Sequence, residues 1–429
     1  MTETAFGDDL LRFLGAAPTP HHAVAELSRR LTGAGFRRLD EAEEWRLDSG
    51  ARYFVIRDGS LVAFSLGADP RTAGWRMVGA HTDSPCLKIK PQPECRKNGC
   101  LQLGVEVYGG ALLNPWFDRD LSLAGCVSFR AAGQVKSALV DFRRPLAVIP
   151  SLAIHLDREA NEKHPVNAQQ HLPAILGRDQ EGSNFSLRAL LLERLREEQP
   201  DAGAEEVLDY DLSLYDTQPP AVVGLNGEFL CAARLDNLLS CHTAVRAIIE
   251  HDVALPCLLV LSDHEEVGSR SHTGAQSPFL RAVLERLSGT GESLQHAIRR
   301  SLLVSCDNAH GIHPNHADRH DANHAPLLNG GPVIKVNAGQ RYATTGETAA
   351  RFREMCRRAG VPLQNFVMRS DLACGSTIGP LAAAEIGVRT VDVGIPQWAM
   401  HSIRETAGTQ DLAHLYNALR EFFRTELLI

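Results

Sequence analysis

The sequence predicts an α/β fold: a mixed sheet flanked by helices, interrupted in the chain by an inserted, mostly β region. Two observations support this class. From residue 219 to the end, short apolar runs alternate with amphipathic helical segments, which is typical of a sheet with helices on its faces. Over residues 101–149, short alternating strands follow one another with glycines between them, which indicates antiparallel pairing. We therefore expect three segments, residues 1–86, 87–218 and 219–429.

The first segment is expected to begin with a helix over residues 21–31, because Ala23, Leu27 and Leu31 recur at helical spacing. Three strand-like apolar runs then follow over residues 51–56, 61–66 and 75–79.

The insertion is expected to contain one clear helix, over Ser186–Glu198, after its series of strands. The last segment is expected to hold helices over Asn237–Glu250 and Pro278–Leu287. A final helix is expected to start at Thr409, a favourable N-cap residue.

Composition excludes several classes of protein. The chain has 429 residues, is 44% hydrophobic and carries a net charge of −8 without a long run of one sign. A nucleic-acid surface would need a basic stripe, and a membrane span would need about 18 consecutive apolar residues. The acidic start, MTETAFGDDL, does not have the apolar run of a signal peptide. The ten cysteines form no CxxC and are expected as reduced thiols, so we expect a cytoplasmic protein.

Five apolar runs are followed by an Asp, Glu or His, in WRMVGAHTDSP, ARLDNLLS, CLLVLSDHEEVGS, SLLVSCDNAHG and TVDVGIPQWAMHS. Sites in α/β folds lie at the carboxyl ends of strands, so these residues are candidate ligands. His81 and Asp83 would face one side of an extended chain, which suits a ligating imidazole oriented by a carboxylate. A polar turn is the alternative. Asp236 precedes a helix, so an N-cap is the alternative to a shared metal ligand.

Neighbouring Glu265 and Glu266 would point to opposite sides of an extended chain. One can then hold a metal ion while the other acts as a general base, and an exposed Glu pair is the alternative. The candidate ligands are His81, Asp236, Glu266, Asp307 and His401. Nitrogen and oxygen ligands without a thiol suit zinc, cobalt or manganese, and five ligands with a shared carboxylate can serve two ions.

The chain resembles the aspartyl aminopeptidases, cytosolic metallopeptidases with two metal ions. The matching stretches lie in the family's order over nearly the whole chain: VGAHTDSPCLKIKP, LQLGVEVYGG, PWFDRDLSLAG, IPSLAIHLDR, ARLDNLLSCHTA, DHEEVGS, DNAHGIHPN, GGPVIKVNAGQRYAT, RSDLACGSTIGP and AMHSIRE. The resemblance implies a zinc-peptidase-like catalytic domain formed by residues 1–86 and 219–429, with residues 87–218 as a dimerisation and substrate domain.

The resemblance also implies roles for the ligands. His81 and Asp307 would hold one divalent ion, and Glu266 and His401 would hold the other. Asp236 would bridge both ions, with a cis peptide bond to the following Asn. Zinc is the expected metal, with cobalt and manganese as alternatives.

The implied reaction is the release of one N-terminal residue, preferably Asp or Glu, by a hydroxide that bridges the two ions. Glu265 would be the general base and later the acid, and Asp83 would orient His81. A different metallo-amidase, such as a carboxypeptidase or deacylase, and a non-catalytic assembly or cargo-binding protein on the same scaffold are the competing hypotheses.

Four further residues are implied to contact the peptide substrate: His155, His310, Lys335 and Tyr342. His155 would reach the active site of a neighbouring subunit in a dodecamer built from dimers, although from the sequence alone a buried core histidine is the simpler interpretation. Lys335 would bind the acidic side chain, with a solvated lysine as the alternative. The pair Gln397-Trp398 does not fit the family pattern.

Overall fold

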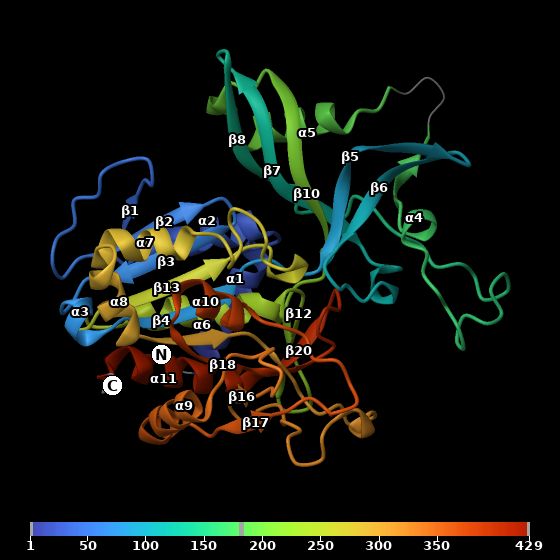
Figure 1. Cartoon of the computed structure of the whole chain (residues 1–429). Helices are drawn as coiled ribbons and strands as arrows, with labels where there is room; N and C mark the ends of the chain where they lie inside the picture. The colour runs from blue at the N-terminus through green and yellow to red at the C-terminus, as the bar shows by residue number, and fades with distance from the viewer. Residues whose placement is uncertain (1–2, 180–183, 427–429) are drawn as a thin grey trace. The chain divides into compact units, whose positions relative to one another are not determined.

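The computed structural model describes residues 3–179 and 184–426, which divide into two compact units (Figure 1). The first unit consists of residues 3–83, Pro220–Met400 and residues 405–426. The second consists of Ser84–Pro219 and the short segment His401–Arg404. The divisions in the chain fall at 83/84 and 219/220.

A nine-stranded mixed sheet forms the centre of the first unit. Its strands, in spatial order, are β1 Arg37–Leu39, β2 Arg52–Arg57, β3 Ser60–Ser65, β13 Cys257–Ser262, β4 Arg76–His81, β14 Leu302–Cys306, β18 Arg389–Gly394, β16 Val333–Lys335 and β17 Gln364–Phe366. The four central strands β13, β4, β14 and β18 are parallel, while β3 and β16 join them antiparallel on either side. The carboxyl ends of four neighbouring strands therefore meet at one edge of the sheet.

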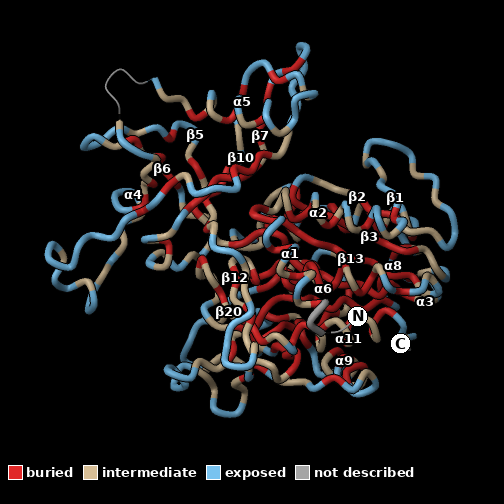
Figure 2. Tube along the Cα trace, turned by 180° about the vertical axis from the view of Figure 1, so that it is seen from behind, coloured by how far each residue is buried: buried red, intermediate tan, exposed pale blue. Residues whose placement is uncertain are grey.

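Both faces of this sheet are buried under helices. Along β13, Leu259 and Leu261 belong to one apolar core, while Leu258 and Val260 belong to another. The first core includes residues of α1 Glu3–Ala16, α2 Pro20–Gly33, α6 Leu235–Ile249, α9 Gly346–Ala359 and α11 Thr409–Arg424. The second includes residues of α7 Phe279–Ser288, α8 Glu292–Arg299 and α10 Ile378–Ile386. Figure 2 shows the buried trace concentrated in these strands and in the helices beside them. A strand buried on both faces reads as a continuous apolar run, as CLLVL does.

A second, five-stranded sheet in the same unit carries several residues of the site described below. Its order is β11 Ala221–Val223, β12 Phe229–Ala232, β20 Glu405–Gly408, β19 Pro396–Trp398 and β15 Ala309–His310. The remaining short elements of the unit are α3 Pro70–Ala73, η3 Glu265–Val267 and η4 Ala317–Arg319.

The second unit is built on a six-stranded antiparallel sheet, as the short alternating strands predict. The strand order is β8 Gln134–Asp141, β7 Leu121–Ala131, β10 Glu206–Asp216, β5 Cys86–Lys97, β6 Cys100–Tyr108 and β9 Ala174–Arg178. Its helical pieces are η1 Asn114–Trp116, α4 Ala168–His171, α5 Leu187–Glu198 and η2 Pro200–Ala202. Helix α5 buries Leu187, Leu191 and Leu195 in the core of this unit, and Ser186 caps its start.

Two expectations for helices were wrong. The chain opens with α1, a helix that we did not predict, although Phe6, Leu10 and Phe13 recur at helical spacing and are buried. Helix α11 starts at Thr409 as expected, but its N-cap is Gly408 and not Thr409. The Thr409 hydroxyl instead donates to the carbonyl of Gly227 at 3.0 Å, which ties the helix start to the loop before β12.

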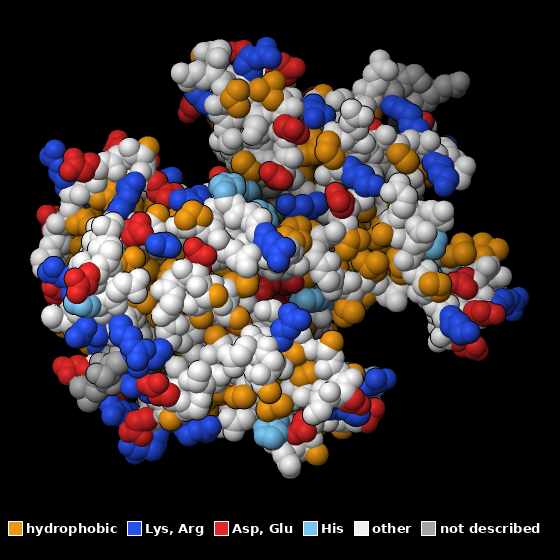
Figure 3. Space-filling model, viewed as in Figure 1, with side chains coloured by type: hydrophobic (Ala, Val, Ile, Leu, Met, Phe, Trp, Pro, Cys, Tyr) orange, Lys and Arg blue, Asp and Glu red, His pale blue; other side chains and the backbone are white. Residues whose placement is uncertain are grey.

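The charged side chains of the surface are mixed in sign, as the sequence without long runs of one charge indicates. Acidic and basic side chains are interspersed over the face seen in Figure 3. Within the described residues, no helix combines the length and the apolar character that crossing a bilayer requires. All ten cysteines are free thiols, as expected.

Candidate metal centre

The carboxyl edge of the nine-stranded sheet brings His81, Asp307 and the two glutamates together. His81 is the last residue of β4 and lies opposite Ser262, the last residue of the parallel strand β13. Glu265 and Glu266 follow β13, and Asp307 directly follows β14, which pairs with the other side of β4. Three distant segments of the sequence therefore end beside one another because their strands are parallel neighbours.

His81 lies between two carboxylates. Its Nε2 is 3.4 Å from Oδ1 of Asp236 and 3.6 Å from Oδ1 of Asp307. All three side chains are buried, and their potential ligand atoms lie within 4.8 Å of one another. This is the separation expected of ligands that can converge on a common ion.

Asp83 holds the polar groups around His81 in place. The Nδ1 atom of His81 lies 3.1 Å from the backbone carbonyl of Asp83 and 3.4 Å from its Oδ1. The two carboxylate oxygens of Asp83 accept the backbone N–H groups of Glu265 and Glu266, each at 3.1 Å. Asp83 is fully buried. The carboxylate contacts both the imidazole and the turn that carries the two glutamates.

The two glutamates lie in a turn and not in extended chain. They form the start of the short 3-10 helix η3, entered through His264 at a φ of 62°. The argument from opposite sides of a strand therefore does not apply. One ligand atom of each lies within 4.8 Å of the other and of His81. Both side chains are partly buried, so the exposed-pair alternative is wrong.

Asp236 is not the N-cap of α6, because Arg234 occupies the cap position and Asp236 lies inside the helical run. The helical run of α6 begins at Leu235, but Asp236 itself has φ −83° and ψ 105°, and Asn237 is also non-helical. The peptide bond between Asp236 and Asn237 is cis, as the resemblance implies. This local departure from helical backbone leaves the Asp236 carboxylate beside His81 instead of over the helix start.

The electrostatics of this group indicate an excess of negative charge in a buried place. Burial raises the pKa of Glu265 to about 8, and the nearby Asp307 adds to the effect. Burial and then Asp236 raise the pKa of Glu266 well above its usual range. Burial lowers the pKa of His81, but its contacts with Asp236, Asp307 and Asp83 outweigh this and raise the pKa well above the ordinary value. Neighbouring negative charges disfavour the ionisation of a carboxyl group, and a bound cation would favour it.

The donor set therefore fits divalent metal ions. Five carboxylates, from Asp83, Asp236, Glu265, Glu266 and Asp307, surround the imidazole of His81 in the first unit. Buried carboxylates at this density need a counter-charge, and imidazole with carboxylate oxygens is a donor set that zinc accepts. Among the described residues, the groups of possible ligands include none of His313, His316, His320 and His324.

Two of the predicted residues belong to the second unit. His401 starts the segment His401–Arg404, and its Nδ1 lies 3.1 Å from the carbonyl of Gly110. Its role as a ligand stays a prediction. His155 is exposed in a stretch with the exposed side chains of Leu152, Ile154 and Leu156, so the core-histidine interpretation is wrong.

Lys335 is not a solvated lysine. Its side chain is only 2% exposed. The ammonium group donates to the carbonyl of Asn308 at 3.1 Å, and it lies 3.6 Å from Oδ2 of Asp307 and 5.1 Å from the ring centroid of Tyr342. A buried cation next to a candidate ligand is a suitable partner for a substrate carboxylate.

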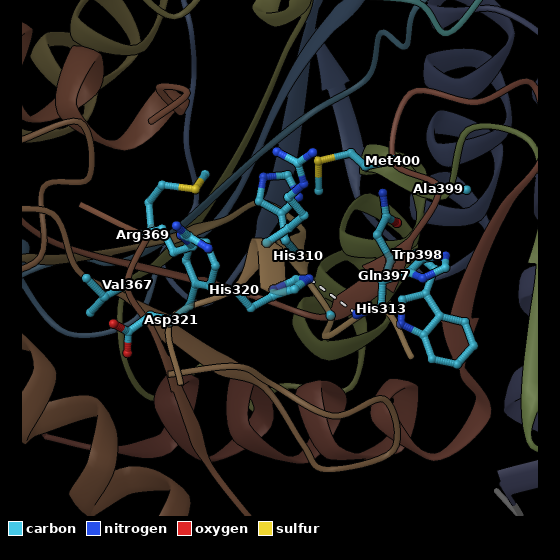
Figure 4. A pocket seen from close by; sticks show the side chains of 14 residues that line it. His310, His313, His320, Asp321, Val367, Arg369, Gln397, Trp398, Ala399 and Met400 are labelled. Carbon is cyan, nitrogen blue, oxygen red and sulfur yellow. Dashed lines mark hydrogen bonds between the residues drawn. The ribbon is translucent and has the colours of Figure 1, made fainter. Parts of the chain in front are cut away.

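A pocket of about 250 Å³ opens beside His310 (Figure 4). His310, His320, Gln397, Trp398 and Met400 contribute to its wall. His310 packs edge-on against Phe366, whose ring in turn lies 6.5 Å from that of Tyr342. The pocket wall and the surroundings of Lys335 thus share Phe366.

Comparison with known proteins identifies the family. The model of the family "Aminopeptidase I zinc metalloprotease (M18)" matches residues 13–423. A "Probable M18 family aminopeptidase 2" of Pseudomonas aeruginosa (strain PAO1) is 60% identical over 421 residues, 98% of each chain. Among solved structures, one from a complex of Ape4 and Nbr1 has a TM-score of 0.94 at 37% identity, covering 98% of this chain and 86% of that one. The mApe1 dodecamer of yeast has a TM-score of 0.83 at 30% identity, covering 97% and 96%. The chain therefore belongs to the aminopeptidase I (M18) family of zinc metalloproteases and is a metal-dependent aminopeptidase.

Proposed function

We propose that this aminopeptidase releases N-terminal Asp or Glu from peptides with two divalent ions, expected to be zinc. The ions would be held by His81, Asp236, Glu266, Asp307 and His401. The observation that carries this proposal is the convergence of His81, Asp236 and Asp307, with Glu265 and Glu266 grouped around the same imidazole within 4.8 Å. Carboxylates and imidazole in this arrangement are suited to holding metal ions beside a reacting peptide bond.

Glu265 is the proposed general base. The ions, when bound, would polarise the scissile carbonyl and make water more acidic. Glu265 takes the proton from the attacking water and delivers it to the leaving amine. Asp83 supports this step by accepting the backbone N–H of Glu265 at 3.1 Å, which fixes the turn from which the side chain extends.

The preference for an acidic residue would come from Lys335. Its buried ammonium offers a charge-assisted hydrogen bond to a substrate carboxylate, and Tyr342 lies over the same group. His310 is the proposed contact for the rest of the peptide, because it borders the pocket of about 250 Å³.

We also propose a homo-oligomer, a dodecamer built from dimers, in the cytoplasm. The yeast mApe1 structure is a dodecamer. The exposed stretch around His155, with Leu156 at 74% exposure, is the kind of surface that a neighbouring subunit would cover. His155 would then reach the neighbour's site. The ten free thiols fit a reducing compartment.

The proposal is tested with Glu265→Gln, which keeps the size of the side chain but removes the base. Zinc content measured by elemental analysis should stay near that of the wild type, while turnover of an Asp-anilide should fall at least about 100-fold. A panel of Asp-, Glu-, Leu- and Ala-anilides with N-acyl amino acids separates an aminopeptidase from a deacylase. Substantial residual turnover by Glu265→Gln would contradict the assignment of the base.

A further inference from the structure

Glu405 and Gln397 are connected to the candidate ligand Asp236 by hydrogen bonds and take no part in the proposed chemistry. Both are almost fully buried, at 1% and 2% exposure. Glu405 is the first residue of β20, and Gln397 is the middle residue of the neighbouring antiparallel strand β19. Buried polar side chains are normally hydrogen-bonded, so the partners of these two indicate what they hold in place.

A continuous chain of hydrogen bonds joins these residues to Asp236. Oε2 of Glu405 accepts the backbone N–H of Asp236 at 3.0 Å. Oε1 of Glu405 accepts from Nε2 of Gln397 at 3.4 Å, and Oε1 of Gln397 accepts from Nδ2 of Asn308 at 2.8 Å. Asn308 uses the same Nδ2 to donate to the carbonyl of Leu235 at 3.0 Å.

The two ends of this chain contact one peptide group. The carbonyl of Leu235 and the N–H of Asp236 belong to the same peptide unit, the one that leads into Asp236. Asn308 donates to its oxygen and Glu405 accepts from its nitrogen. Because the two ends are held at once, the peptide unit has little freedom to rotate, and the direction of the Asp236 side chain is set with it.

The carboxylate of Glu405 also sets the direction of every donor in the chain. An ionised carboxylate can only accept, so Gln397 must turn its nitrogen towards Glu405 and its oxygen towards Asn308. Asn308 must then present its nitrogen, which is the group that the carbonyl of Leu235 requires.

We propose that Glu405 and Gln397 are positioning residues that fix the peptide group before Asp236 and so hold its carboxylate in the geometry for metal binding. This inference rests on the proposed role of Asp236 as a shared ligand.

Exchanging the two side chains tests this role. In Glu405→Gln, one end of the new amide still accepts from Asp236, but its nitrogen then faces the nitrogen of Gln397. In Gln397→Glu, two carboxylates face each other where a bond of 3.4 Å now stands. The double variant Glu405→Gln/Gln397→Glu keeps a donor opposite an acceptor in each of the hydrogen bonds described above. The carboxylate introduced on β19 accepts from Asn308 and from the amide introduced on β20, and the oxygen of that amide accepts from Asp236.

Three quantities are measured for each variant: zinc affinity by competition with a chromophoric chelator, kcat and KM for an Asp-anilide, and the thermal midpoint of the metal-free protein. Each single variant should lose about 10–100-fold in zinc affinity and in kcat. KM should stay within about threefold. The double variant should recover zinc affinity and kcat to within about threefold of the wild type.

A control removes a buried hydrogen bond elsewhere in the first unit. The hydroxyl of Ser288 accepts from Nε1 of Trp75 at 2.9 Å, just before β4 and at the opposite end of that strand from His81. Ser288→Ala should lower the thermal midpoint and leave zinc affinity and kcat unchanged. A loss of function that came from general destabilisation would appear in this variant as well.

The inference is overturned if the single variants keep the zinc affinity and kcat of the wild type. It is also overturned if the zinc affinity and kcat of the double variant are no higher than those of the single variants. If a single variant does not fold, the zinc affinity and kcat of the double variant are compared with those of the wild type, and a double variant that does not recover them overturns the inference. A wild-type protein that binds no zinc and cleaves no anilide would reject the proposed function together with the inference. A wild type that does both, with unaffected variants, rejects the inference only.

Discussion

Replacing Lys335 by Met removes one buried charge and little volume. The Lys335 ammonium lies 3.6 Å from Oδ2 of Asp307 in a side chain that is 2% exposed. At an effective dielectric constant of about 20, two unit charges at this distance attract by about 4–5 kcal/mol. If Asp307 holds a metal ion, as proposed, the Lys335 ammonium would be available to a substrate carboxylate.

We expect Lys335→Met to change selectivity and not only rate. A hydrogen bond to a charged group is worth about 1.5–3 kcal/mol, so kcat/KM for an Asp-anilide should fall about 10–150-fold. The value for a Leu-anilide should stay within about threefold, because a Leu side chain makes no use of the ammonium. Zinc content is measured in parallel, since Lys335 also contacts a candidate ligand.

Lys90→Met serves as the matched control. This lysine donates to Oε1 of Gln169 at 2.8 Å in the second unit, and its loss should leave the ratio of the two substrates unchanged. Equal losses for Asp- and Leu-anilides in Lys335→Met would refute the selectivity role. They would show that Lys335 acts through Asp307 alone.

Three further predictions concern the ligand support, the metal and the packing of the first helices. Asp83→Asn leaves one of the two backbone N–H groups that Asp83 accepts at 3.1 Å without an acceptor. The free energy of unfolding in urea should therefore fall by about 1–3 kcal/mol and kcat by about 10–100-fold. An unchanged kcat would argue against the support role of Asp83. Removal of metal with a chelator should lower the thermal midpoint of unfolding. Zinc at 100 times its Kd should then restore about 2.7 kcal/mol of the free energy of unfolding. A midpoint that does not change with zinc would contradict a metal centre in the folded protein. Asp9 on α1 accepts from Arg30 on α2 at 2.7 Å and contacts Nε2 of His242 on α6 at 2.9 Å, and the bond from His242 holds the pKa of Asp9 far below its usual range. A depressed carboxyl pKa stabilises the fold above the unfolded value of about 4 and loses this effect as the pH falls further. Asp9→Asn should therefore cost about 1–3 kcal/mol at neutral pH, with a difference from the wild type that shrinks below about pH 4 in unfolding experiments; a constant difference would argue against the ionised pair.

Several features of the candidate site could be predicted because they are local. A buried strand such as CLLVL appears in the sequence as an apolar run, and the polar residues that follow it mark where the strand ends. The same holds for His81 at the end of β4 and for Asp307 directly after β14. The unpredicted α1 was also a local signal, since Phe6, Leu10 and Phe13 already carried its spacing.

Other features depend on contacts that are distant in sequence. The turn of η3 places Glu265 and Glu266 against Asp83, 182 and 183 residues away, and an assumption of extended chain missed it. Glu405 was missed for the same reason, because nothing in its neighbourhood shows that its carboxylate accepts from Asp236, 169 residues away.

The amino-acid sequence by itself determined the class of fold, the strands that end in carboxylates or imidazole, and the kind of metal chemistry these groups allow, since periodicity and residue chemistry are properties of short segments. Only the tertiary structure decided that β13, β4 and β14 are parallel neighbours, that Lys335 is buried beside Asp307, and that His155 is exposed. Strand order and burial arise from pairing and packing between segments far apart in the chain, and no short stretch contains that information.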